Sequence, residues 1–323
     1  MAVAVGRRGS RSGGDRGGMR CAGDLPAEGR LSGPEARGNL GVMATSEVLW
    51  VGRIGTAAGA RWVQVQASGA APAAGDELRA IDDPFADEEG DPYAQVRASA
   101  GGEVLGRVGA VKLLAPVRPS KVLCVGRNFR AHAAELGNEV PTEPLLFFKP
   151  PSCLIASGEA VTLPRGYERI DMEAELVVVI GRRATAIGAS EAWQHVAGYT
   201  LGNDVSNRDL QKRDKQWTRA KGFDGFGPIG PWLRLVPPGT VLPAGALRIQ
   251  GGVDGVRRQD ASLADMVFDV PYLLAYISAC MTLVPGDVIY TGTPEGVSAL
   301  TPGVTTRVEL AGWEMPPLEN PTR

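Results

Sequence analysis

The sequence predicts a strand-rich protein of mixed α+β class. Short runs rich in β-branched and aromatic residues alternate with Gly- and Pro-containing turns over residues 46–118 and again over 232–320. Between these regions, Asp171–Gly181 is crowded with Val and Ile and ends at a glycine, which is typical of a buried β-strand. Helical segments are interspersed among these runs, so both kinds of element share one chain.

Composition indicates a globular protein and excludes several partner classes. The 323 residues are 44% hydrophobic and 22% charged, and the formal net charge is −2. That balance gives no basic footprint for nucleic acid and no cationic face for anionic lipid. Uninterrupted apolar runs are far too short to span a bilayer. We therefore expect neither a nucleic-acid partner nor a membrane.

The cysteines and histidines are few and scattered. Cys21, Cys124, Cys153 and Cys280 form no CxxC and no zinc spacing, so a reducing compartment, the cytoplasm, is expected. The two histidines are too few for a His-rich zinc site.

The first 42 residues have the composition of an unfolded extension. Gly, Arg and Ser dominate, and no hydrophobic period is present. Scattered acidic residues argue against a transit peptide, and no apolar segment suits a secretory signal. We predict that residues 1–42 are disordered and dispensable, and that Met43 is a natural beginning.

Residues 46–118 predict a small β-rich N-terminal domain. Three strand-like runs, at 48–54, 61–66 and 106–114, are joined by Gly-, Ala- and Pro-rich turns. The acidic patch over 82–91 lacks the ligand spacing of a calcium-binding loop, so it is predicted to be a solvated loop without chemistry of its own.

A short helix after this domain carries a histidine. The strand-like run 122–125 precedes a helix predicted over 129–136, with Asn128 as its N-cap and Gly137 as its stop. His132 and Glu135, three residues apart, share one face, and a carboxylate orients an imidazole for general-base catalysis. A surface His–Glu pair is the alternative. A Pro- and Glu-rich loop follows, so the helix could act as a lid.

The buried strand at 171–181 carries two carboxylates at its entrance. Alternate residues of a strand share a face, so Glu173 and Glu175 are predicted to lie side by side. Their repulsion requires water, a cationic partner or a bound cation. Asp204, between a strand and a helix, is either an N-cap or a third oxygen ligand.

The remaining elements complete the prediction. They are a helix around 192–196 in which His195 is structural, a helix over 205–213, a Gly- and aromatic-rich loop over 217–231, a hairpin about Asp254–Gly255, a core helix over 266–282, a strand ending at Tyr290 and a loop over 291–296. No glycine-rich nucleotide-binding motif and no nucleophile elbow is present.

Taken together, the polar residues resemble a known family. His132-x-x-Glu135, Glu173-x-Glu175, Asp204, Lys221 within RAKGFDGFGPIGP, and TGTPEGV at 291–297 occur in the order and at the intervals of the fumarylacetoacetate hydrolase family. The chain resembles this family over about residues 119–312. The resemblance implies a β-roll catalytic domain over 119–320, a homodimer and a bound divalent cation.

The resemblance also implies roles for individual residues. It implies Glu173, Glu175 and Asp204 as metal ligands, His132 and Glu135 as the catalytic dyad with Lys221 as a further catalytic contact, and Arg127, Asn128, Gln211 and Thr293 as substrate contacts. Two departures, Phe129 in place of a frequent Tyr and the pair Asp171-Met172, bear on substrate preference.

The donor set and the resemblance together predict a reaction class. Three carboxylates without a nitrogen or sulfur ligand select a hard cation, Mg²⁺ or Mn²⁺. The expected substrates are small 2-oxo or enol dicarboxylic acids, processed through a metal-stabilised enolate. The closest resemblance is to the 2-hydroxyhepta-2,4-diene-1,7-dioate isomerases and acylpyruvate hydrolases. An oxaloacetate decarboxylase or tautomerase is the alternative, and a catalytically silent metal- and ligand-binding relative is the alternative of another class.

Overall fold

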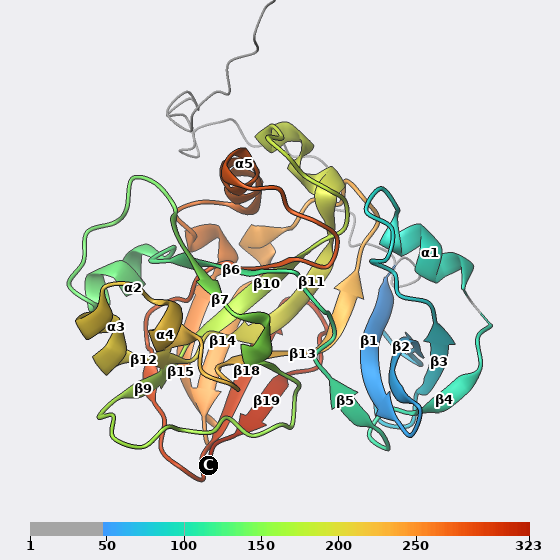
Figure 1. Ribbon diagram of the computed structural model, residues 1–323, viewed down its shortest axis with the longest axis horizontal. Coiled ribbons are helices and arrows are strands. Elements are labelled where there is room, and N and C mark those ends of the chain that lie inside the picture. The colour runs from blue at the N-terminus through green and yellow to red at the C-terminus, as the bar shows by residue number, and fades with distance from the viewer. Residues whose placement is uncertain (1–47, 100) are drawn as a thin grey trace, which may run out of the picture.

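The structure confirms the strand-rich mixed α+β class. It is a computed structural model that describes residues 48–99 and 101–323, so the extension predicted over 1–42 lies outside the described residues. Strands form the body of the molecule, and short helices lie at its margins (Figure 1). None of the helices in the described ranges is both long and apolar enough to cross a membrane.

A 12-stranded sheet dominates the described residues. Its strands run in the order β4 (Val104–Arg107), β3 (Glu77–Ile81), β2 (Gly59–Gln66), β1 (Leu49–Thr56), β13 (Gly227–Leu235), β11 (Val196–Asn203), β10 (Ala174–Ile180), β16 (Val288–Tyr290), β6 (Val122–Gly126) and β7 (Leu145–Lys149), with β5 (Lys112–Leu114) paired to β1 and β8 (Leu154–Ile155) paired to β13. Most neighbours are antiparallel, whereas β6 and β16 run parallel.

Strand β10 explains why its sequence is a continuous apolar run. Leu176, Val178 and Ile180 belong to one hydrophobic cluster, whereas Val177 and Val179 belong to another. Successive side chains of a strand point to opposite faces, so β10 is buried on both faces. All seven of its residues are buried. The strand is therefore a rigid support for whatever its ends carry.

Two smaller sheets pack beside the large one. One has the order β15 (Val256–Ser262), β14 (Arg248–Val253), β18 (Thr305–Ala311) and β19 (Leu318–Pro321), and the other β12 (Ser206–Asn207), β9 (Ile170–Met172) and β17 (Ser298–Ala299). The hairpin predicted about Asp254–Gly255 is confirmed by the pairing of β14 with β15.

The N-terminal strands extend the large sheet. Strand β1 pairs with β13, so β1 to β4 continue the sheet beyond the strands that follow residue 119. Figure 1 shows these strands and α1 (Pro92–Ala98) at one end of the molecule. The helix α1 was not predicted: Asp91, from the acidic patch, is its N-cap and accepts a hydrogen bond from the Ala94 amide. The division into domains stays a prediction.

The helices differ in part from the prediction. They are α2 (Arg130–Glu135), α3 (Arg208–Asp214), α4 (Thr218–Lys221) and α5 (Val270–Cys280), with 3₁₀ turns η3 (Pro151–Cys153), η4 (Ala189–His195), η5 (Ala244–Ala246) and η6 (Leu263–Asp265). The stretch 217–231 is therefore not only a loop, because it contains α4 and the start of β13. A central residue of that stretch, Phe226, is buried, which drives this order.

One predicted N-cap is wrong, and an alternative considered for a second residue does not hold. The N-cap of α2 is Phe129, and the Asn128 side chain instead bonds Phe268 and the carbonyl of Thr291. The N-cap of α3 is Asn207, so Asp204 is not an N-cap. Local capping rules fail here because tertiary partners outcompete a nearby helix end for these polar side chains.

Candidate metal centre and catalytic pocket

The candidate site forms where several strand ends meet at one edge of the large sheet. Because β6 and β16 are parallel, α2 and the loop 291–297 leave the sheet at the same edge. Strand β10 is antiparallel to β16, so it begins at that edge. Strand β11 is antiparallel to β10 and ends there. Segments far apart in sequence are thereby brought together.

Three carboxylates meet at this edge. In the β10–β11 register Glu175 faces Gly202 and Ala174 faces Asn203, which brings Asp204 beside Glu173. The Asp204 amide donates to the Glu173 carbonyl over 2.9 Å. One ligand atom from each of Glu173, Glu175 and Asp204 lies within 4.8 Å of the others, and all three residues are buried.

The strand carrying the two glutamates is interrupted, contrary to the prediction of one continuous element. Strand β9 ends at Met172 and β10 begins at Ala174, with Glu173 between them. The Glu173 amide leaves the β10 ladder and donates to the Asn203 side chain over 2.9 Å. The break does not separate the carboxylates, because the Asn203 side chain and the Asp204 amide both bond the Glu173 backbone.

Two buried lysines and an arginine contact the carboxylates. Lys221 Nζ donates to Glu173 over 2.6 Å and to Asp204 over 2.5 Å. Lys149 Nζ donates to Asp204 over 2.6 Å, and Arg208 donates to Glu173 over 2.6 Å. Burial alone disfavours the charged lysine, yet the charges of Asp204 and Glu173 raise the pKa of Lys221. Lys221 is therefore a fixed cation within the site.

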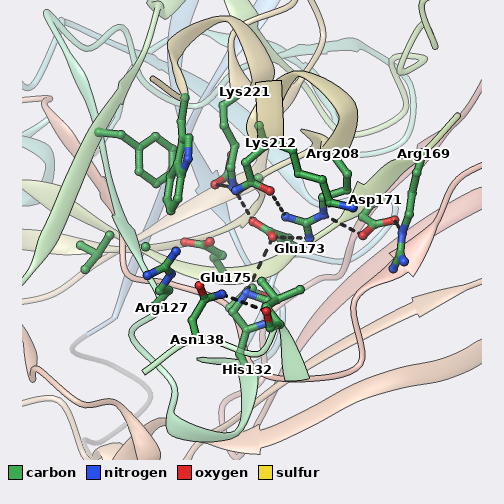
Figure 2. Close-up of a pocket in the computed structure, with 18 residues that line it drawn as sticks. Arg127, His132, Asn138, Arg169, Asp171, Glu173, Glu175, Arg208, Lys212 and Lys221 are labelled. Carbon is green, nitrogen blue, oxygen red and sulfur yellow. Dashed lines mark hydrogen bonds and ion pairs between the residues drawn. The ribbon is translucent and has the colours of Figure 1, made fainter. Parts of the chain in front are cut away.

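The same cations hold Glu173 ionised. Burial opposes ionisation, but the charges of Lys221 and Arg208 lower the pKa of Glu173 below its ordinary range. Figure 2 shows Lys221 and Arg208 on one side of Glu173 and His132 on the other. Glu173 is thus an oxygen donor available at every physiological pH.

Glu175 differs from its neighbours, because no cationic side chain of residues 48–99 and 101–323 contacts it. Its Oε2 accepts a hydrogen bond from the Gly292 amide over 2.7 Å. Burial first, and then the charges of Asp204 and Glu173, raise the pKa of Glu175 well above its ordinary value. Gly292 has φ +101°, and a Cβ there would lie 2.6 Å from the Asn128 Cβ, so only glycine delivers this amide.

A divalent cation fits this donor set. The three carboxylates provide oxygen ligands only, which suits a hard ion, and their ligand atoms are close enough to share one. A cation at this point would also neutralise the charge of Glu175, which meets no cationic side chain among the described residues. The predicted ligand trio therefore lies together, although side chains of Lys221, Lys149 and Arg208 already contact two of its members.

Helix α2 presents its histidine to this cluster. His132 Nδ1 lies 3.2 Å from Glu135 Oε2, and Nε2 lies 4.0 Å from Glu173 Oε1. Glu135 Oε1 accepts a hydrogen bond from the Gly296 amide over 3.0 Å. Glu135 therefore joins α2 to the loop 291–297 while it orients the imidazole, which is buried. This arrangement leaves Nε2 as the nitrogen that faces the cavity.

A cavity of about 330 Å³ lies between these groups. Eight of the residues singled out from the sequence line it: Arg127, His132, Glu173, Glu175, Asp204, Gln211, Lys221 and Thr293. The volume suits a small organic ligand.

Three predicted substrate contacts are already engaged by protein groups. Both amide hydrogens of Asn128 are used within the fold and the residue does not line the cavity, so the structure gives no support to a substrate contact there. The Thr293 hydroxyl donates to the Ala174 carbonyl over 3.0 Å. The Gln211 side-chain oxygen accepts from Arg208 over 2.8 Å, and its amide nitrogen remains available.

Three site residues were missed from the sequence as contacts of the carboxylates. They are Lys149, Arg208 and Asp171. Asp171 Oδ2 accepts from Arg208 over 2.8 Å, which links it to Glu173. A signal existed for Lys149, since a lysine closes the apolar run 145–148 and a buried lysine requires acidic partners.

Comparisons with known proteins agree with this arrangement. Residues 121–321 match the family model described as the fumarylacetoacetate hydrolase C-terminal domain. A 5-carboxymethyl-2-hydroxymuconate delta-isomerase from Mycobacterium smegmatis superposes with a TM-score of 0.68 at 35% identity, covering 84% of this chain and 98% of that one.

Two further relatives carry different names. A 2-hydroxyhepta-2,4-diene-1,7-dioate isomerase from Mycobacterium marinum superposes with a TM-score of 0.68 at 34% identity, over 85% of this chain and 98% of that chain. A mitochondrial oxaloacetate tautomerase of Arabidopsis thaliana is 42% identical over 197 residues, which is 60% of this chain and 87% of the relative. The named activities thus differ within one fold.

Proposed function

This chain belongs to the fumarylacetoacetate hydrolase family of enzymes, and from that premise we propose that it acts on small 2-oxo or enol dicarboxylic acids with a divalent metal, Mg²⁺ or Mn²⁺. The observation that carries the proposal is the position of His132 Nε2, 4.0 Å from Glu173 at the edge of the carboxylate cluster. A base and a cation site thereby face one cavity.

Different side chains of the site would bind the metal, accept a proton and stabilise negative charge. Glu173, Glu175 and Asp204 would hold the cation, which when bound supplies Lewis-acid polarisation of a substrate carbonyl. Glu135 holds the proton-bearing Nδ1 side of His132, which leaves Nε2 to accept a proton from water or a substrate carbon. Lys221 keeps a fixed positive charge where negative charge develops.

Two reaction types remain in consideration. We favour a 2-hydroxyhepta-2,4-diene-1,7-dioate isomerase-like or acylpyruvate hydrolase-like activity, because the mycobacterial isomerase covers 85% of this chain. An oxaloacetate decarboxylase or tautomerase is the second candidate, supported by the 42% identity to the Arabidopsis tautomerase. All of them require proton transfer next to a polarised carbonyl, which His132 and the cation site would provide.

We also propose a homodimer in a reducing, cytoplasmic setting. The three cysteines in the described part of the chain, Cys124, Cys153 and Cys280, are free thiols, which suits a reducing compartment. Sedimentation or light scattering of the purified protein tests the dimer, and a monomer at micromolar concentration would contradict it.

A substrate panel tests the function. Metal-free protein is assayed by ultraviolet absorbance on oxaloacetate, acylpyruvates and hydroxymuconate-type dienes, with and without Mg²⁺ or Mn²⁺. We expect metal-dependent turnover of at least one class. Glu173→Ala or Asp204→Ala should abolish metal binding and turnover, and full activity in either variant would refute the assignment. Metal binding with no turnover across the panel would favour the silent relative.

A further inference from the structure

Each of the three carboxylates at the site has one oxygen engaged by a fixed donor. Glu173 Oε1 accepts a hydrogen bond from Arg208 over 2.6 Å. Glu175 Oε2 accepts a hydrogen bond from the Gly292 amide over 2.7 Å. Asp204 follows the same pattern, and its donor is a buried lysine to which the proposed function gives no part. The role of that lysine is therefore open.

The lysine is Lys149, the last residue of β7. Its Nζ lies 2.6 Å from Asp204 Oδ1 and also donates to the carbonyl oxygen of Lys221. The Lys149 side chain is fully buried, and it is not among the residues that line the cavity. A buried ammonium is held by its acceptors, because leaving them would strand an unpaired charge. Lys149 therefore engages Asp204 from outside the cavity and has no direct contact with a ligand bound there.

Lys221 engages the other oxygen of Asp204. Its Nζ donates to Asp204 Oδ2 over 2.5 Å and to Glu173 Oε2 over 2.6 Å, and Figure 2 shows its contact with Glu173. Unlike Lys149, Lys221 lines the cavity, which gives its ammonium space to move when a cation reaches these two oxygens. The two lysines thus divide the carboxylate of Asp204: Oδ1 is committed to Lys149, and Oδ2 is left for the cation.

We propose that Lys149 is a positioning residue that makes Asp204 a one-oxygen ligand and thereby selects Mg²⁺ or Mn²⁺ against Ca²⁺. This inference rests on the cation site of the proposed function. Mg²⁺ requires octahedral geometry at short distances, whereas the larger Ca²⁺ takes more oxygens and often binds both oxygens of one carboxylate. A cation bound by both oxygens of Asp204 would lie beside the buried ammonium of Lys149, and like charges repel strongly where water is excluded.

The selectivity between two metals tests the role of Lys149. Dissociation constants are measured on metal-free protein, for Mn²⁺ by electron paramagnetic resonance and for Ca²⁺ by its displacement of bound Mn²⁺. The proteins are wild type, Lys149→Met, Lys149→Gln and the control Lys121→Met. Lys121 precedes β6, donates to the buried Asp287 and does not line the cavity. Its substitution therefore also removes a lysine from a buried aspartate, but away from the cation site.

Wild type should bind Mn²⁺ about tenfold or more tightly than Ca²⁺. Lys149→Met should remove most of this preference, because Asp204 can then present both oxygens. Lys149→Gln, which keeps a donor, should remove less of it, and Lys121→Met should keep all of it. An unchanged Mn²⁺ to Ca²⁺ ratio in Lys149→Met, whatever the absolute affinities, overturns the inference, because a merely structural lysine would affect both metals alike. Equal affinity of wild type for the two metals also overturns it without reference to any variant. The proposed function stands in both cases, whereas failure of wild type to bind either metal overturns both.

Discussion

At the scale of single residues, the carboxylates of the site are not equivalent. Glu173 and Asp204 each contact cationic side chains, whereas in the described part of the chain Glu175 accepts a hydrogen bond from a backbone amide and meets no cation. Burial and its acidic neighbours raise the pKa of Glu175. A carboxyl whose pKa is raised on folding is unfavourable to the folded state once pH exceeds its unfolded pKa, because folding then opposes its ionisation.

Glu175→Gln should therefore stabilise the metal-free protein. The cost of the buried carboxylate is absent below the unfolded pKa of a glutamate, about 4.3, and it develops as pH rises. In a chelator, the variant should melt at a higher temperature than wild type at pH 8, and the two should converge near pH 4. Calorimetric scans at both pH values measure this.

The order should reverse when Mg²⁺ is present. The cation binds the folded wild type and stabilises it by mass action, whereas the variant lacks a ligand. If Glu175→Gln melts below wild type in chelator at pH 8, the ionised Glu175 carboxylate does not destabilise the metal-free protein. If Mg²⁺ stabilises both proteins equally, Glu175 is not a ligand.

The identities of the site residues could be predicted from the sequence more readily than their hydrogen-bond partners. The spacing of these residues identified groups that do lie together: His132 and the three carboxylates line one cavity, and Glu135 contacts His132. Lys149 was missed because the antiparallel pairing of β6 with β7 and the approach of α4 set its contact with Asp204, and neither is visible locally. Asn128 was wrongly predicted as the N-cap of α2, because its side chain bonds partners 140 and 163 residues away.

At the scale of elements, one carboxylate of α2 contacts both the catalytic histidine and the loop 291–297. Glu135 contacts His132 through one oxygen and the Gly296 amide through the other. Glu135→Gln keeps the size of the side chain but gives one of these contacts a donor in place of an acceptor. The helix itself is short, six residues, and has no side-chain N-cap, so its isolated stability is low.

Glu135→Gln should lower kcat on the order of 10- to 100-fold, less than His132→Ala, which removes the base itself and should cost roughly 10²- to 10⁴-fold. Neither change removes a carboxylate of the cluster, so Mn²⁺ affinity should stay within a factor of about two of wild type. Steady-state kinetics beside metal titrations separate these effects. Unchanged kcat in Glu135→Gln would show that the carboxylate does not orient His132.

Individual elements were easier to predict than their partners. Strand β10 and the hairpin β14–β15 follow from β-branched content and an Asp-Gly turn, both of which are local signals. The pairing of β1 with β13 joins residues more than 180 positions apart. No local pattern specifies such a pairing, since it depends on complementary burial of whole faces.

At the scale of the molecule, burial divides the thiols into two classes. Cys124 and Cys153 are buried, and burial raises the pKa of Cys153 to about 11. Cys280 is exposed at the end of α5. Because the thiolate is the reactive form, burial and a raised pKa both disfavour reaction at Cys153, and exposure favours reaction at Cys280.

Alkylation at pH 8 followed by peptide mapping should therefore modify Cys280 within minutes. Cys124 and Cys153 should react only after denaturant is added. Their alkylation should begin at the denaturant concentration at which the protein unfolds. The variant Cys280→Ser is the control, since it should leave both buried thiols protected from alkylation. Rapid native modification of Cys153 would contradict the closed packing of strands β6 to β8 around the site.

The large sheet gives the whole molecule its functional geometry. Strands β6, β10, β11 and β16 place four parts of the site at one edge: α2, the two glutamates, Asp204 and the loop 291–297. We propose that three buried carboxylates at this edge hold one divalent cation.

Titration of Mn²⁺ into metal-free protein, followed by electron paramagnetic resonance, measures that claim most directly. Wild type and His132→Ala should each bind one ion per chain with similar affinity, and Asp204→Ala should bind none at the same concentrations. Undiminished binding in Asp204→Ala, or no binding in wild type, would contradict the account.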